Sequence, residues 1–235
     1  MCRPAPGVAE EIRRVTRELS GQGYRVLGVA RATHTGAEFP AAQDNFTWEF
    51  LGLVALENPP KANAAAVIQS FLAAGIQVKM ITGDFPETAQ AIARQMGLPG
   101  ADTLLTGQQV MDLSGAGLRE QAESTAVFAR MFPEAKLRVV EALKATGEVV
   151  AMTGDGVNDG PALKAAHIGV AMGRRGTEVA RQAASLVLVD DDLAGMVTAI
   201  AHGRRIYQNF KKAVFYVVTL PHDFHMFLIV SNLPD

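Results

Sequence analysis

The sequence predicts an α/β fold in which helices cover both faces of a parallel sheet. Apolar strand patterns alternate with helical patterns from about residue 50 onward, and the strand patterns are almost continuously apolar. Such runs are typical of parallel strands that are buried on both faces. Strands are expected at 50–56, 78–81, 125–128, 149–152, 168–171 and 186–189. Helices are expected at 62–74, 87–96, 133–145, 160–166 and 177–183.

The first 48 residues form a separate piece, since a charged helix over 8–19 and a short strand over 24–30 precede a polar loop. We therefore expect three parts: residues 1–48, a sheet domain over 49–200 and a C-terminal segment over 201–235.

Composition excludes several classes of protein. The 22 basic and 24 acidic residues nearly balance, which argues against a nucleic-acid partner. The single cysteine, Cys2, excludes an internal disulfide framework and the usual multi-cysteine metal sites. The N-terminus lacks the apolar core of a signal peptide.

The C-terminal segment has the features of the start of a membrane helix. Residues 213–220 and 226–230 are apolar, but Pro221, His222, Asp223 and His225 interrupt them, so the run is shorter than the ~20 residues of a spanning helix. The basic stretch 203–212 resembles the cytoplasmic flank of such a helix. We expect a stalk helix over 192–218, with a buried terminal helix as the alternative.

Two polar turns follow apolar strands, which is where ligands bind in parallel sheets. The second turn holds Asp155, Asn158 and Asp159 between glycines. Two carboxylates at this place can bind Mg²⁺, which takes one or two protein carboxylates together with a phosphate. The alternative is that Asp159 only caps the following helix.

The first turn, Thr82-Gly83-Asp84, offers a hydroxyl and backbone N–H groups at a helix entrance, which suits an anion. A simple helix cap is the alternative there. Lys136, near the start of the 133–145 helix, is either solvated or a point charge for a phosphate. A P-loop, a dinucleotide fingerprint and an EF-hand pattern are all missing from the sequence.

These motifs resemble those of the P-type cation-transporting ATPases, a branch of the haloacid-dehalogenase superfamily. The stretch MTGDGVNDGPALKAAHIGVAMG resembles their hinge motif, MITGD their second phosphate motif, FPEAK their lysine segment and ENPPK their interdomain stretch. The resemblance runs from about Gly7 to Leu220. It implies a Rossmann-like, haloacid-dehalogenase-like phosphorylation domain, a remnant of the nucleotide-binding domain and a stalk leading to a truncated transmembrane helix.

The resemblance also implies residue roles. Asp155 would bind the catalytic Mg²⁺, with Asn158 and Asp159 supporting the metal and phosphate site. Thr82, Gly83 and Asp84 would hold the transferred phosphoryl group, whose charge Lys136 would neutralise.

Two further basic residues would contact ATP phosphates, namely Arg25 and Lys61. Lys61 stands where the family often has arginine, and Asn58 replaces its usual aspartate. The implied partners are ATP, the transported cation and membrane lipid. The implied location is a membrane, with these domains on its cytoplasmic side.

One departure limits the implied activity. The family phosphorylates the aspartate of an Asp-Lys-Thr-Gly-Thr motif, and none of the aspartates here is followed by Lys-Thr-Gly. The chain is thus expected to be a pump fragment that supplies metal and phosphate elements without the nucleophile. A non-catalytic Mg²⁺- and phosphate-binding regulatory module is the alternative. A soluble phosphatase of the same superfamily would need an Asp-x-Asp near a first strand, which is missing from the sequence.

Overall fold

The computed structural model describes residues 6–36 and 39–219. The chain divides into two compact units, Met1–Asp191 and Asp192–Asp235. The first unit contains an antiparallel hairpin and two parallel sheets with their helices, and the second contains one long helix.

The N-terminal part of the first unit consists of α1 (Pro6–Gly21) and the antiparallel pair β1 (Arg25–Arg31) and β2 (Glu49–Leu56), with a short 3-10 turn, η1 (Gln43–Asn45), between the strands. The Thr88 hydroxyl in α3 (Pro86–Gln95) donates to the Tyr24 carbonyl at 3.1 Å, which joins this hairpin to the helices of the sheet region.

The structure corrects the prediction that residues 50–56 are a buried strand of the parallel sheet. β2 pairs only with β1 among the described strands, and most of its residues are half-buried or exposed. Its apolar run, with Leu51 53% exposed, is therefore a hairpin strand that is open to solvent. The expected boundaries at 48/49 and 200/201 remain predictions.

The parallel strands form two sheets, each with three strands, in the orders β3-β5-β4 and β6-β7-β8. Their bounds are β3 (Met80–Ile81), β4 (Leu104–Thr106), β5 (Val127–Ala129), β6 (Ala151–Gly154), β7 (Ile168–Met172) and β8 (Leu186–Leu188). All pairs are parallel, which confirms the predicted α/β class. One continuous sheet was expected, but β3 and β6 do not pair with each other.

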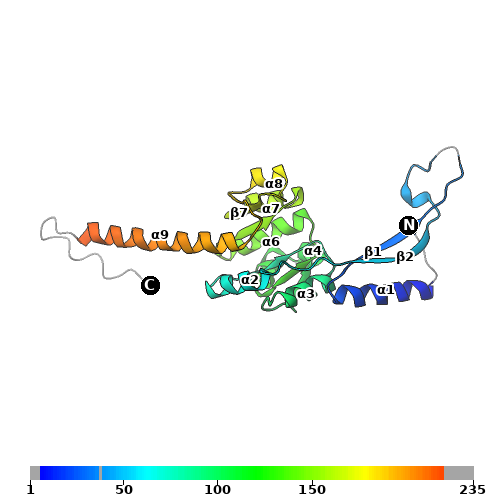
Figure 1. Cartoon of the computed structure of the whole chain (residues 1–235), viewed down its shortest axis with the longest axis horizontal. Coiled ribbons are helices and arrows are strands. Elements are labelled where there is room, and N and C mark those ends of the chain that lie inside the picture. The colour runs from blue at the N-terminus through cyan, green and yellow to red at the C-terminus, as the bar shows by residue number, and fades with distance from the viewer. Residues whose placement is uncertain (1–5, 37–38, 220–235) are drawn as a thin grey trace. The chain divides into compact units, whose positions relative to one another are not determined.

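Helices connect these strands and pack on them, as Figure 1 shows for α7 and α8 beside β7. Besides α3, the connecting helices are α2 (Ala64–Ala73), α4 (Gly107–Asp112), α5 (Gly115–Ser124), α6 (Pro133–Ala145), α7 (Gly160–Ala165) and α8 (Glu178–Ala183). A 3-10 turn, η2 (Val157–Asp159), precedes α7. Gly75 and Gly97 follow α2 and α3 with φ of 73° and 68°, so they end these helices as predicted.

The core of the first sheet forms two clusters, one around Phe128, Val139 and Leu118, and one around Val127, Ala93 and Ile68. A third cluster, around Leu163, Met152 and Ala171, belongs to the second sheet.

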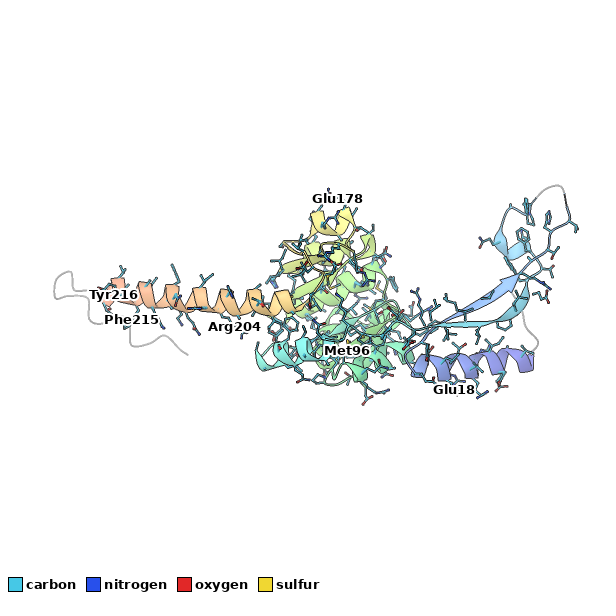
Figure 2. The ribbon with its side chains drawn as sticks, in the orientation of Figure 1. Glu18, Met96, Glu178, Arg204, Phe215 and Tyr216 are labelled. Carbon is cyan, nitrogen blue, oxygen red and sulfur yellow. The ribbon has the colours of Figure 1, made fainter. Side chains whose placement is uncertain are left out.

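The second unit is α9 (Ala194–Thr219), close to the stalk helix expected over 192–218. None of its residues is buried, and Arg204, Phe215 and Tyr216 project from it in Figure 2. Within residues 6–36 and 39–219, none of the helices is both long enough and apolar enough to cross a membrane. Pro221, His222, Asp223 and His225 lie outside the described residues.

Candidate functional site

A partly buried ion pair links the two sheets. The Lys136 ammonium lies 2.6 Å from Oδ1 of Asp159, and the two side chains are only 13% and 10% exposed. Lys136 lies in the first turn of α6, which follows β5, and Asp159 ends the turn that follows β6. Lys136 is therefore not a solvated lysine, and the carboxyl ends of the two sheets lie on the same side.

Asp159 is held by the turn that it closes. Its Oδ2 accepts the N–H of Gly156 at 3.2 Å, while its position before α7 provides no side-chain cap for that helix. The capping alternative for Asp159 is therefore wrong.

Gly154 makes this conformation of Asp159 possible. A Cβ at position 154 would lie 2.5 Å from Cβ and 2.8 Å from Cγ of Asp159. Only glycine lets the aspartate fold back against the strand end. The only signal of this contact in the sequence is the glycine itself.

Asp155 follows β6 directly and is exposed. Its carbonyl accepts the N–H of Thr177 at 2.8 Å, which ties the turn to the start of α8. Within the described part of the chain, neither a hydrogen bond nor an ion pair is recorded for its carboxylate.

The carboxylates of Asp155 and Asp159 are compatible with a Mg²⁺ ion that has only one or two protein ligands. The described residues contain no group of three or more His, Cys, Asp or Glu side chains that could hold a metal ion. Mg²⁺ needs only one or two carboxylates when waters and a phosphate complete its shell. Asp155 is available for such an ion, whereas Asp159 would have to exchange Lys136 for it. Asn158 lies exposed in the same turn.

The Thr82 turn is closed by its own side chains. The Thr82 hydroxyl donates to Oδ2 of Asp84 at 2.9 Å and accepts the Asp84 N–H at 3.1 Å. Phe85, not Thr82 or Asp84, is the N-cap residue of α3 and makes no side-chain cap. The cap alternative for Thr82-Gly83-Asp84 is therefore also wrong.

Backbone hydrogen bonds join this turn to the segment that leads to Lys136. The Met131 N–H donates to the Thr82 carbonyl and the Arg130 N–H to the Asp84 carbonyl, both at 2.9 Å. Arg130 adopts a φ of 53°, and its guanidinium lies 4.6 Å from the centre of the Phe85 ring. A non-glycine residue with positive φ is uncommon, so this conformation of Arg130 could not be predicted from the sequence.

The described contacts of Lys61 and Arg25 are not with this group of residues. The Lys61 ammonium donates to the carbonyl of Asp191, and Arg25 starts the exposed hairpin strand β1. Burial alone would raise the pKa of the Asp191 carboxyl, but the N–H groups of Arg174 and Arg175, at 2.9 and 3.0 Å, hold that pKa below its usual value. The described contacts thus bring Lys136, Asp159 and the Thr82 turn together, without Lys61 or Arg25.

This chain is similar to a described protein family and to several named ATPases. Residues 7–167 match the family described as haloacid dehalogenase-like hydrolases. A cation-transporting ATPase of Synechocystis is 42% identical over 229 residues, which cover 95% of this chain and 25% of that protein. A probable cation-transporting ATPase of Mycobacterium tuberculosis is 47% identical over 215 residues, or 88% of this chain and 24% of that protein.

A calcium-transporting ATPase of Saccharomyces cerevisiae is 41% identical over 204 residues, or 85% of this chain and 22% of that protein. The chain thus spans about a quarter of the length of these relatives.

Proposed function

Because this chain belongs to the haloacid dehalogenase-like hydrolases, we propose that it is the part of a P-type cation-transporting ATPase that supplies the Mg²⁺- and phosphate-binding elements for ATP hydrolysis. Its similarity to proteins named cation-transporting ATPases supports this branch of the family. The complete protein would couple an aspartyl-phosphate to cation movement across a membrane, with this region on the cytoplasmic side.

The observation that carries the proposal is the Lys136–Asp159 pair beside the two polar turns. A lysine held in a partly buried place by a carboxylate presents a fixed positive charge, and phosphoryl transfer depends mainly on such positioning and charge neutralisation. Lys136 would exchange part of its contact with Asp159 for a phosphate oxygen.

The other turn residues bind and orient the phosphate in this proposal. The Thr82 hydroxyl and the Gly83 and Asp84 N–H groups would donate to its oxygens at the entrance of α3. Bound Mg²⁺ would supply charge neutralisation, held by Asp155 and, after exchange with Lys136, by Asp159. Asn158 would orient a ligand of the ion, and Arg25 and Lys61 are proposed to contact ATP phosphates in the complete protein.

The covalent step needs an aspartate that this sequence does not show, since Lys-Thr-Gly follows none of its aspartates. That missing motif favours a second candidate, a regulatory module that binds Mg²⁺ and phosphate without turnover. Both candidates require the same metal site. They differ in whether an aspartate supplied by a longer polypeptide becomes phosphorylated.

A Mg²⁺ titration tests the proposed site. We expect Asp155→Ala to weaken Mg²⁺ binding, followed by NMR shifts of the 153–159 turn, by about tenfold or more, since even outer-shell changes cost 10–100-fold. The matched control is Asp112→Ala, because Asp112 is exposed on α4, away from the turn in sequence. Equal affinity of Asp155→Ala and the control would contradict the assignment.

A further inference from the structure

The peptide group between Asp155 and Gly156 is held at both of its polar ends. Its carbonyl accepts the N–H of Thr177 at 2.8 Å, and its N–H donates to Oδ2 of Asp159 at 3.2 Å. Because a peptide group is planar, these two bonds fix its orientation. The direction in which the exposed Asp155 side chain leaves the backbone is therefore set by Thr177 and Asp159.

The Thr177 N–H is itself placed by a short loop, Gly173-Arg174-Arg175-Gly176, which joins β7 to α8. A Cβ at position 176 would lie 2.0 Å from the carbonyl oxygen of Met172. The backbone thus folds back onto the end of β7 just before it reaches Thr177. Two side chains, described next, hold this 173–176 loop in its tight conformation.

The carboxylate of Asp191 binds the N–H groups of the loop. Its Oδ1 accepts the N–H of Arg174 at 2.9 Å, and its Oδ2 accepts the N–H of Arg175 at 3.0 Å. Asp191 is only 7% exposed and adopts a φ of 54°, which is uncommon for a residue other than glycine. The two oxygens of one buried carboxylate therefore fix two successive N–H groups of the loop.

The guanidinium of Arg181, on α8, binds the carbonyls at the two ends of the loop. Its Nη1 donates to the carbonyl of Gly176 at 2.6 Å and to that of Gly173 at 3.1 Å. Its Nη2 donates to Oε2 of Glu178 at 2.6 Å, but the Glu178 side chain is 65% exposed, and such exposed ion pairs contribute little. The bonds to the carbonyls are thus the contacts of Arg181 that shape the loop.

We propose that Arg181 and Asp191 are positioning residues for Asp155, which act through the 173–176 loop and the Thr177 N–H. They hold the loop in the conformation in which this N–H meets the Asp155 carbonyl. The inference rests on the proposed function of Asp155 as a Mg²⁺ ligand, and it names the residues that keep this ligand in place. Because Mg²⁺ demands near-ideal octahedral geometry, a small rotation of the Asp155 backbone weakens its binding.

The first experiment removes the hydrogen bond through which both residues act. Thr177 has a φ of −66°, which is the value that proline imposes, so Thr177→Pro removes the N–H without changing this angle. We expect this variant to bind Mg²⁺ about tenfold or more weakly than the native chain, in a titration followed by NMR shifts of the 153–159 turn. Thr177→Val is the matched control, because it also loses the hydroxyl that caps α8 but keeps the N–H. It should lose much less affinity.

The second experiment removes each support separately, with a neighbouring control. Arg181→Met loses the bonds to the loop carbonyls, whereas Glu178→Gln loses only the exposed ion pair of Arg181. Asp191→Asn loses one of the two oxygens that accept loop N–H groups, whereas Asp190→Asn loses only its exposed ion pair with the Arg174 guanidinium. We expect the two support variants to bind Mg²⁺ at least about twofold more weakly than their controls.

Amide hydrogen exchange of Thr177 in the metal-free chain gives a readout that is independent of Mg²⁺. Exchange should be faster in Arg181→Met and Asp191→Asn than in the two controls, because a displaced loop breaks the bond from Thr177 to the Asp155 carbonyl. A role in stability alone would lower Tm and leave Mg²⁺ affinity unchanged.

Three results would overturn the proposal. The first is Thr177 exchange that is equal in the support variants and their controls. The second is Mg²⁺ affinity that is equal in Thr177→Pro and Thr177→Val. The third is a lowered Tm with native Mg²⁺ affinity in Arg181→Met and Asp191→Asn. If the native chain itself binds no Mg²⁺, the proposed function fails instead, and Thr177 exchange alone decides whether Arg181 and Asp191 position Asp155.

Discussion

Gly154→Ala is the substitution whose effect the structure predicts most sharply. The added Cβ would lie 2.5 Å from Cβ and 2.9 Å from Oδ2 of Asp159. Because the first of these atoms is fixed to the backbone, the turn itself must move. Overpacking of this kind costs about 1–3 kcal/mol, and Lys136, left without its partner, adds about 1–3 kcal/mol.

We expect a total loss of about 3 kcal/mol in the free energy of unfolding. For a domain of this size, that lowers Tm by roughly 6–12 °C, which differential scanning calorimetry measures directly. The matched control is Gly156→Ala, because its Cβ would lie 3.6 Å from Asp159 Oδ2, an ordinary contact, and its φ of −107° suits any residue. Gly156→Ala should melt within about 2 °C of the native chain. Equal melting of the two variants would refute the close approach of Asp159 to Gly154.

Three further outcomes are expected. Incubation with γ-labelled ATP and Mg²⁺, then acid precipitation, should leave no label on the chain, because the phosphorylated aspartate motif is missing; label retained on an aspartate would contradict the fragment assignment. Because the folded-state pKa of Asp191 is lowered, its stabilisation is complete above its usual pKa of 3.8 and is lost as pH falls through the folded value. Asp191→Asn should thus have a lower Tm than the native chain at pH 6, and its Tm should fall less than that of the native chain as the pH is lowered further. If the Tm of both proteins falls equally with pH, Asp191 is not involved. Deletion of residues 213–235 should leave the first unit folded and improve solubility, since α9 exposes Phe215 and Tyr216 at 58% and 64%; unfolding of the truncated chain would instead assign this segment to the core.

Elements with strong local signals could be predicted from the sequence. α6 begins and ends as expected, at Pro133 and Ala145, because proline at the first helical position fixes its start. The strands and helices from β5 onward also fall within a few residues of their expected places.

Weaker signals were missed. The patterns did not predict β4, α4 or α5, although Thr106 and Gln109 form a capping box that the sequence shows as Thr-x-x-Gln. The strand β2 was assigned to the wrong sheet, because an apolar run does not reveal which strand it will pair with.

The site was predictable in its residue types but not in its contacts. Strand ends and glycine-flanked turns identified Thr82, Asp155 and Asp159 as candidates. The bond between Lys136 and Asp159 joins residues 23 positions apart, and periodicity carries no information about such a pair. For the same reason, the sequence could not show that β3 and β6 stay unpaired.

The chain resembles P-type cation-transporting ATPases through several motifs, and contacts of the described residues bring three of them, those of Thr82, Lys136 and Asp159, together. The family match and the named relatives confirm this resemblance. Metal binding and phosphate binding at these residues remain proposals.

Binding of inorganic phosphate, measured by calorimetry with and without Mg²⁺, tests the central claim most directly. If Asp155, Thr82 and Lys136 form one site, Mg²⁺ should tighten phosphate binding, and by linkage phosphate should tighten Mg²⁺ binding by the same factor. Lys136→Met should abolish phosphate binding but keep or strengthen Mg²⁺ binding, because Asp159 is released from its ion pair. Phosphate binding that is independent of Mg²⁺ and unchanged in Lys136→Met would contradict the account.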